Sequence, residues 1–427
     1  MTNTIEQISK NKVDELAIKT GIPLFPEPVH VGRPNIGSQK AFLSRMQDIL
    51  DRRWLSNGGP MVVEFERRLQ EYLGVRNAIC ITNATVALEL VIRALDLKGE
   101  VIVPSFTFIA TAHALQWQEI TPVFADVEST SHHIDPEGIE KLITPRTTGI
   151  IGVHLWGLPC KHAQLQEIAD RRGLTLLYDA AHAFGCTLDG QMIGNFGAAE
   201  VFSFHATKFF NSFEGGAIAT NDDALAERLR LMRNFGFKGY DSVEHIGTNG
   251  KMTEASAAMG LTNLDSIDEF MAANVRNYAL YQQFLGDLPG CRFIQYPNHE
   301  QTNYQYVVLE IDKEKAGIDR DSILRILHSE NILARRYFYP GCHRMEPYRS
   351  LYPYNVYRLP QTEELVRRVL VLPTGTAIHP HEIEAIASVV RLVLTNPEEC
   401  RDLLAIERQN KGLIAAKAGQ STATAAS

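Results

Sequence analysis

The stretch "SFHATKFFNSFEGGAI", Ser203 to Ile218, places a single lysine, Lys208, between two apolar runs. The run that ends in "VFSF" predicts a buried β-strand, and "GGAIAT" predicts the start of another. A lysine ammonium is costly to bury unless it is paired or loses its proton. Lys208 is therefore a candidate functional residue.

Short apolar runs alternate with helical stretches between Asn77 and about Ala219. The predicted strands are "NAICIT", "EVIVP", "TPVFAD", "GIIGVH", "LTLLYD", "AEVFSF" and "GGAIAT", and the predicted helices between some of them are "TVALELVIRAL", "IATAHALQW" and "KHAQLQEIADRRG". This alternation predicts an α/β fold with a mainly parallel central sheet flanked by helices.

The flanking segments predict four regions. Residues 1–35, with irregular Pro and Gly, predict an extended and loosely held arm, and 36–285 form the large α/β domain, which ends in a long helical segment from about Thr253. Residues 286–395 predict a smaller C-terminal α+β domain, and 396–427 a largely disordered extension. Small residues in "EASAAMGLTNLDSI" allow close helix packing, either within the subunit or across a dimer.

Composition excludes several classes of protein. The 427 residues are 45% hydrophobic and 22% charged with a net charge of −8, and no basic stripe predicts nucleic-acid binding. No apolar run reaches the ~18 residues of a membrane span, and the N-terminus shows no signal-peptide run. The six cysteines form no CxxC pair, so we expect reduced thiols, a cytoplasmic protein and no metal site.

Two further segments lie where strands of the sheet are predicted to end. Asp179 follows "LTLLY", and Asn83–Thr85 stand at a strand-to-helix turn; for each, a helix N-cap is the simpler interpretation. Together with Lys208, these two segments also fit a cofactor-binding site. A helix N-terminus binds phosphate, and a lysine with a carboxylate 29 residues earlier matches what pyridoxal 5'-phosphate requires.

Several strings then point to one family. "SFHATK", "EGGAI", "YDAAHAFG", "VPSFTFIATAHA", "WLSNGGP" and "GTNGKMTEASAAMGL" occur in an order that resembles the DegT/DnrJ/StrS sugar aminotransferases, from about Val31 to Leu394. This resemblance implies the fold type I aminotransferase architecture and pyridoxal phosphate as cofactor. It also implies transfer of an amino group from L-glutamate to a nucleotide-linked keto sugar.

The resemblance also assigns residues. Lys208 is implied to be the Schiff-base lysine, Asp179 the partner of the pyridine nitrogen, and His182 a neighbour of the ring hydroxyl, with a core histidine as the alternative. The implied cofactor contacts further include a stacking aromatic, a phosphate cradle and an asparagine from the neighbouring subunit, which implies a homodimer with shared sites: Phe108, Ala84, Thr85, Ser203 and Asn249. The candidates for the sugar pocket are Asn57, Gly58, Trp156 and Tyr337. Phe108 also fits plain core.

The residues after the lysine bear on the position of the sugar that is aminated. Glu214, Gly215 and Gly216 resemble relatives that act at C4, whereas relatives that act at C3 read closer to "KNLG…GDAG". The expected substrate is therefore a 4-keto-6-deoxyhexose such as dTDP-4-keto-6-deoxy-D-glucose. For the two glycines, a simple turn before a strand is compatible with this interpretation.

Besides a C3-acting aminotransferase, three other classes of protein are alternatives to a C4-acting sugar aminotransferase. Sugar dehydratases of the same family carry histidine in place of the lysine, and Lys208 argues against them. Nucleotide-sugar dehydrogenases and epimerases need a G-x-G-x-x-G turn after an early strand, which the sequence lacks. A non-catalytic, pyridoxal-phosphate-bound regulatory protein would be expected to carry a DNA-binding module or a basic stripe, and neither is found.

Overall fold

The computed structural model describes residues 9–409 of the chain. Its centre is a seven-stranded sheet in the order β2-β10-β9-β6-β5-β3-β4, and all seven predicted strands are confirmed. Only β10 runs antiparallel to its two neighbours, and the remaining pairs are parallel. The strands are β2 (Asn77–Ile81), β3 (Glu100–Pro104), β4 (Thr121–Ala125), β5 (Thr147–Val153), β6 (Thr175–Asp179), β9 (Glu200–Ser203) and β10 (Gly216–Thr220).

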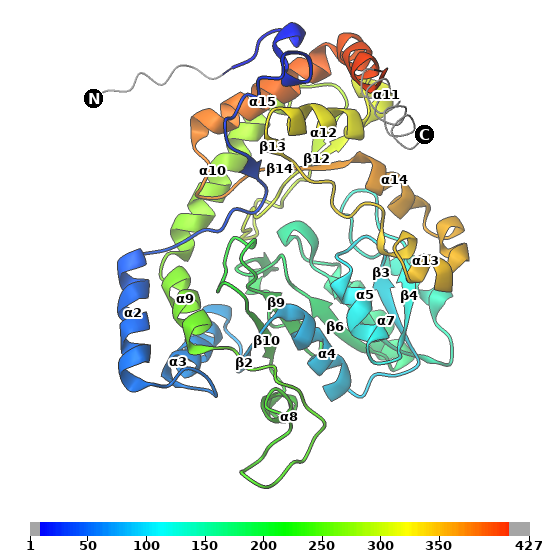
Figure 1. The fold of residues 1–427 in the computed structure, drawn as a ribbon. Helices are drawn as coiled ribbons and strands as arrows, with labels where there is room; N and C mark the ends of the chain where they lie inside the picture. The colour runs from blue at the N-terminus through cyan, green and yellow to red at the C-terminus, as the bar shows by residue number, and fades with distance from the viewer. Residues whose placement is uncertain (1–8, 410–427) are drawn as a thin grey trace, which may run out of the picture.

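Helices cover both faces of this sheet (Figure 1). One face packs against α4 (Ala84–Ala94), α5 (Ala110–Gln116) and α8 (Asp223–Met232) in a core of aliphatic side chains. The other face carries α3 (Pro60–Leu73), α7 (His162–Arg172) and α9 (Glu254–Leu264), with α6 (Pro136–Ile139) beside α7. Strands buried on both faces explain why their sequences are continuous apolar runs instead of alternating ones.

The long helical segment expected from Thr253 is two helices. Thr253 caps α9, which ends at Leu264, and α10 (Ile267–Leu285) begins after Asp265 and Ser266. Such short polar side chains compete for backbone hydrogen bonds and favour helix ends. The small residues of α9 serve packing within the subunit: a Cβ on Gly260 would lie 2.4 Å from the Phe65 ring of α3.

A smaller α+β domain follows α10, which leads from one domain to the other (Figure 1). Its antiparallel sheet has the order β11-β12-β14, and a core of aliphatic side chains joins this sheet to α10, α12 and α15. The elements are β11 (Cys291–Phe293), β12 (Val307–Ile311), α11 (Lys313–Ala316), α12 (Arg320–Ser329), α13 (Tyr348–Leu351), α14 (Pro360–Arg368), β14 (Val369–Leu372) and α15 (Pro380–Thr395).

The N-terminal arm is packed, which corrects the expectation that it is loosely held. It contains α1 (Ala17–Thr20) and β1 (Val29–His30), and β1 pairs in parallel with β13 (Ile332–Leu333) of the small domain. Glu330 is fully buried and accepts hydrogen bonds from the backbone N–H groups of Ala17 (2.6 Å) and Leu24 (2.7 Å). It also forms an ion pair with Lys10 at 2.7 Å. No local pattern in the sequence indicates this packing of the arm, because the acceptor lies about 300 residues away in the chain.

Asn35 ends the arm at the junction of the two domains. Its side-chain amide donates to the carbonyl of Phe209, next to Lys208, and its side-chain oxygen accepts from the backbone N–H and hydroxyl of Thr376, each at 2.8 Å. Asn211 donates to the Asn35 carbonyl, also at 2.8 Å. The arm therefore connects the lysine loop to the small domain. Between Asn35 and the large domain proper, α2 (Gln39–Arg52) packs on α9.

The C-terminal extension begins as a helix and not as a disordered tail. Residues 397–409 are helical, and Cys400 and Leu404 are buried in the core of the small domain. The remainder of the predicted tail, 410–427, lies outside the described residues. Between residues 9 and 409, no helix is both long enough and apolar enough to cross a membrane.

Candidate active site

The candidate residues meet at one edge of the large sheet. β6 ends at Asp179, β9 ends at Ser203, and the antiparallel β10 begins at Gly216, so the loop that carries Lys208 spans this edge. α4 starts at the same edge after β2. These elements surround a cavity of about 660 Å³. The carboxyl ends of parallel strands are where open α/β sheets bind ligands.

Asp179 is buried at the bottom of the cavity and does not cap a helix. Its Oδ2 accepts from the Thr111 hydroxyl at 2.8 Å, and its Oδ1 accepts from the N–H of Ala181 at 3.1 Å in a turn. Burial raises the pKa of Asp179, and the Thr111 and Ala181 hydrogen bonds and the positive charge of Lys208 oppose this rise. The carboxylate is thus oriented and is available to a cationic partner in the cavity.

Lys208 is partly buried and has few polar neighbours. Its Nζ lies 3.4 Å from the hydroxyl of Tyr306, and its ammonium stands 5.9 Å from the centre of that ring. Desolvation lowers the pKa of Lys208 to about 8, against the attraction of Asp179. At pH 7 roughly a tenth of this lysine is therefore a neutral, nucleophilic amine, far more than for a lysine with the usual pKa of 10.5.

His182 is held as a neutral ring with a defined tautomer. Its Nδ1 accepts from the backbone N–H of Trp156 at 3.4 Å, which places the ring proton on Nε2, and Nε2 lies 3.4 Å from the Tyr306 hydroxyl. Burial, with a contribution from Lys208, lowers the pKa of His182 well below its usual range. His182 lines the cavity, so its Nε2–H is placed to donate to an oxygen there, and the core alternative does not describe it fully.

The N-terminus of α4 supplies the anion site. Asn83 is the N-cap and accepts from Val86 N–H at 2.9 Å, while the N–H groups of Ala84 and Thr85 belong to the first turn, which has no intrahelical acceptors. A Cβ on Gly216 would lie 2.9 Å from the Ala84 nitrogen. Glycine there lets β10 pass close to the helix end while Ala84 and Thr85 stay open to the cavity.

Three further predicted residues line the same cavity: Phe108, Ser203 and Tyr337. Phe108 is 58% exposed, which excludes the interpretation of this ring as plain core. Glu214 also lines the cavity and faces His205, with 3.4 Å between the His205 Nε2 and a carboxylate oxygen. Gly215 has a packing role as well, since a Cβ there would lie 2.0 Å from the Ser212 hydroxyl oxygen.

Four predicted residues do not line this cavity in the described chain. Trp156 is 0% exposed and packs behind His182, with its Nε1 donating to His132 at 3.1 Å, so the structure corrects its assignment to the sugar pocket. Asn57 and Gly58 border a separate cavity of about 150 Å³ together with Lys251. Asn249 is exposed and pairs with Asn234 in an isolated antiparallel bridge, after the segment that follows α8. Figure 1 shows a loop that projects beyond α8.

The sequence analysis did not identify two residues of the site. Thr111, from α5, holds Asp179, and Tyr306, from the segment before β12, stands between Lys208 and His182. Thr111 lay inside a quoted string, "VPSFTFIATAHA", but no spacing rule connects it to Asp179. Tyr306 belongs to another domain in sequence terms, and no local pattern could have placed it here.

The comparisons with known proteins agree with this site. A sequence model of the DegT/DnrJ/EryC1/StrS aminotransferase family matches residues 37–391. The chain is 35% identical over 365 residues to dTDP-4-amino-4,6-dideoxy-D-glucose transaminase of Shigella dysenteriae, covering 86% of this chain and 99% of that protein. It is 36% identical over 313 residues to GDP-perosamine synthase of Caulobacter vibrioides, covering 71% and 83%.

Among solved structures, the chain is similar to DesI in the presence of its TDP-sugar product. The TM-score is 0.87 and the sequence identity 48%, over 93% of this chain and 100% of that one. A family match over most of the chain and relatives that align along nearly their whole length leave one conclusion: the chain belongs to the DegT/DnrJ/EryC1/StrS aminotransferase family.

Proposed function

We propose that this protein transfers an amino group from L-glutamate to C4 of a nucleotide-linked 4-keto-6-deoxyhexose, with dTDP-4-keto-6-deoxy-D-glucose as the substrate. The observation that carries the proposal is that Lys208, Asp179 and the α4 N-terminus converge on one cavity. They do so in a chain that aligns over 99% of the length of a dTDP-4-amino-4,6-dideoxy-D-glucose transaminase.

The cavity fits pyridoxal phosphate, the cofactor on which this aminotransferase family depends. Ala84 and Thr85 present free N–H groups for the phosphate, and Asp179 presents an oriented carboxylate for the ring nitrogen. Phe108 offers an exposed ring for stacking, and the His182 Nε2–H is placed to donate to a ring oxygen. When bound, the cofactor supplies an aldehyde that captures amines and a ring that accepts an electron pair.

Three residues of the chain would have separate roles in the proton transfers. Asp179 would hold a proton on the ring nitrogen of the bound cofactor, which would keep the ring electron-poor. The Lys208 amine, whose pKa is lowered by burial, would take the proton from the carbon that bears the amino group and return it to the former aldehyde carbon on the other side of the nitrogen. Tyr306 holds the Nζ of Lys208 on the His182 side of the cavity between these transfers.

Amination at C4 is favoured over C3 by the relatives. Relatives named for 4-amino products align along nearly their full length, and the "EGGAI" segment, which resembles that group, packs closely against Ala84 and Ser212. The solved relative DesI was determined with its TDP-sugar product. The C3-acting and regulatory alternatives have no comparable observation in their favour.

A homodimer with shared sites is part of the proposal. Asn249 is exposed and does not line its own chain's cavity. The segment before it carries several exposed apolar side chains: Phe235, Phe237, Tyr240, Val243 and Ile246. Exposed apolar side chains gathered on one projecting segment are typical of a protein contact. A reducing, cytoplasmic setting is also proposed, and it is supported by six cysteines that are all free thiols.

The test is a substrate panel with mass-spectrometric detection. The pyridoxal-phosphate-loaded protein, L-glutamate and several dTDP-, UDP- and GDP-linked 4-keto-6-deoxyhexoses should yield one 4-amino product, most rapidly from the dTDP-linked sugar. Loss of the visible absorbance on addition of glutamate alone would exclude the regulatory alternative. A 3-amino product, or no amination of any nucleotide-linked sugar, would contradict the proposal.

A further inference from the structure

Ser105, His343 and Glu363 form a continuous hydrogen-bonded chain that the proposed reaction does not use. The Oγ of Ser105 lies 2.7 Å from the Nδ1 of His343, and the Nε2 of His343 lies 2.7 Å from a carboxylate oxygen of Glu363. Ser105 directly follows β3 in the large sheet, His343 belongs to the segment after β13, and Glu363 lies on α14. The chain therefore joins the end of a central strand to segments far along the sequence.

The chemistry of the three groups fixes the direction of each hydrogen bond. A carboxylate can only accept, so the Nε2 of His343 carries the ring proton and donates to Glu363. Burial lowers the pKa of His343, although Glu363 opposes this shift, so the ring is neutral near neutral pH and its Nδ1 is an acceptor. The Ser105 hydroxyl therefore donates to Nδ1, and its oxygen accepts from the backbone N–H of His343 at 3.2 Å.

A serine, a histidine and a carboxylate in this order resemble a hydrolase triad, but burial excludes that role. Ser105 and His343 are both fully buried, and neither lines the Lys208 cavity. A nucleophile must reach its substrate. A buried polar network whose members are all hydrogen-bonded instead holds the segments around it in one arrangement.

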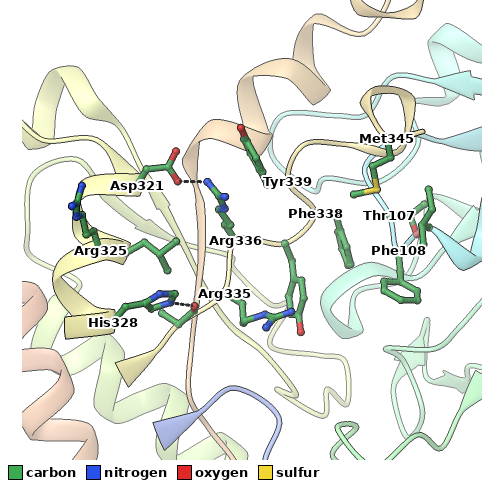
Figure 2. Close-up of a pocket in the computed structure, with 14 residues that line it drawn as sticks. Thr107, Phe108, Asp321, Arg325, His328, Arg335, Arg336, Phe338, Tyr339 and Met345 are labelled. Carbon is green, nitrogen blue, oxygen red and sulfur yellow. Dashed lines mark hydrogen bonds and ion pairs between the residues drawn. The ribbon is translucent and has the colours of Figure 1, made fainter. Parts of the chain in front are cut away.

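The loop that begins at Ser105 carries two residues of the Lys208 cavity, Thr107 and Phe108. The backbone N–H of Cys342 donates to the Ser105 carbonyl at 3.0 Å, and the Cys342 thiol donates to the Thr107 carbonyl at 3.3 Å. Figure 2 shows Thr107 and Phe108 on the same side of a neighbouring cavity as Met345, which follows Cys342 in the chain. The segment that contains His343 therefore holds the loop that presents Phe108.

The other end of the hydrogen-bonded chain is also fixed to the large domain. The carboxylate of Asp126, just after β4, accepts from the N–H and the hydroxyl of Thr362 at the start of α14, each at 2.8 Å. Glu363, the next residue, also forms an ion pair with Arg344 at 2.5 Å. Glu363 is thus a fixed acceptor from which the ring of His343 is oriented.

From these contacts we propose that His343 is a positioning residue for the cofactor and acts through Ser105 on the loop that presents Phe108. The Phe108 ring is exposed, so little packing fixes it, and its position depends on the backbone that carries it. His343 holds that backbone without lining the cavity itself. This inference rests on the proposed cofactor site at Lys208, but not on the identity of the sugar.

The test uses two substitutions of His343 that each keep one half of the chain. The asparagine amide lies near the Nδ1 position, so His343→Asn still accepts from Ser105 but loses Glu363. The longer glutamine reaches the Nε2 position, so His343→Gln keeps Glu363 but loses Ser105. His162→Gln is the matched control, because the Nδ1 of His162, on α7, pairs with the Tyr178 hydroxyl at 2.8 Å outside the cavity.

Calorimetry measures the Kd of each cofactor-free protein for pyridoxamine 5'-phosphate, which binds without a covalent bond to Lys208. His343→Gln should raise this Kd by about fivefold or more, the change expected when one buried hydrogen bond is lost. His343→Asn should restore the Kd to within about twofold of wild type, and His162→Gln should leave it unchanged. An unchanged Kd in His343→Gln would overturn the inference, and so would an equal increase in both His343 variants.

A double-mutant cycle with Phe108→Ala tests whether His343 acts through this ring. Phe108→Ala alone should raise the Kd, and adding His343→Gln should then raise it by less than about twofold, because the ring to be positioned is gone. A full fivefold effect of His343→Gln in the Phe108→Ala protein would overturn the proposed route. An unchanged Kd in Phe108→Ala alone would overturn both the stacking role of the ring and the inference.

Ser105→Ala is a second route to the same answer if the His343 variants fold poorly. It removes only the hydroxyl and should reproduce the increase in Kd expected for His343→Gln, whereas an unchanged Kd would contradict an action through Ser105. Pyridoxamine phosphate binding is measured without any sugar, so this inference and the proposed function fail separately. If the His343 variants behave as expected but no keto sugar is aminated, the proposed reaction is wrong and the positioning role stands.

Discussion

Burial moves the pKa values of Lys208 and Asp179 in opposite directions. It lowers the pKa of the lysine and raises that of the carboxyl, and each charge partly restores the other. Lys208 is therefore placed to exchange a proton with a bound ligand at mildly alkaline pH, while Asp179 is an oriented partner for a cationic group. Such pairs of displaced pKa values are typical of catalytic acid–base sites.

The pH dependence of cofactor capture tests this description of Lys208. In the cofactor-free protein the neutral amine becomes the major form above pH about 8, well below the usual 10.5. Because the unfolded chain holds this proton up to about pH 10.5, stability from this group should increase between pH 8 and 10.5. We expect the rate of covalent pyridoxal phosphate uptake, followed by absorbance, to rise with a midpoint near 8.

Lys208→Ala is the control for that measurement, since it should show no covalent uptake at any pH. A midpoint near 10.5 in the wild-type protein would mean that the lysine is not desolvated as the structure indicates.

Asp179→Asn should retain the cofactor yet slow the reaction. The asparagine oxygen can still accept from Thr111 or Ala181, so the local fold persists, but the ring nitrogen loses the negative charge that keeps it protonated. Electrostatic effects of this kind change kcat by roughly 100-fold or more. A single-turnover assay with glutamate measures the effect, and a reduction of less than tenfold would show that Asp179 serves only to hold the turn.

At the scale of elements, the β-strands were predictable and the connections between distant segments were not. Seven apolar runs identified seven strands because most of these strands are buried on both faces. The break after Leu264, the packing of the arm and the helix at 397–409 depend on partners far away in the chain. For the same reason Lys208 and Asp179 could be identified from sequence, whereas Thr111 and Tyr306 could not.

Glu330 is the element-scale test of the packed arm. Glu330→Ala removes the acceptor for the N–H groups of Ala17 and Leu24, and Lys10 loses its carboxylate partner. Each unsatisfied buried donor costs about 1–3 kcal/mol, so the melting temperature should fall by several degrees and the arm should become sensitive to protease. Glu330→Gln, which keeps one acceptor, should lie between this variant and wild type. An unchanged melting temperature and protease pattern would contradict the packing described for the arm.

At the scale of the whole molecule, the exposed position of Asn249 can be tested by mixing subunits. Lys208→Ala lacks the reactive amine, and Asn249→Asp would set a carboxylate against the phosphate of the neighbouring site. Each variant alone should be inactive. In a mixed dimer one site combines an intact Lys208 with an intact Asn249, and the other carries both changes.

Activity should therefore recover toward half per mixed dimer after subunit exchange, measured by product formation against the fraction of mixed dimer. If exchange is demonstrated by mass spectrometry and no activity returns, Asn249 does not complete the neighbouring site, and the shared-site proposal should be abandoned.

The contacts of Asn35 have a practical consequence for anyone who shortens this chain. The family match begins at residue 37, so trimming to the matched region would remove Asn35 together with the whole arm. The carbonyl of Phe209 and the N–H of Thr376 would lose their partners, and the edge of β13 would be uncovered. A protein cut at that boundary would retain every residue proposed for catalysis. It would still lack the Asn35 contacts that connect the lysine loop to the small domain.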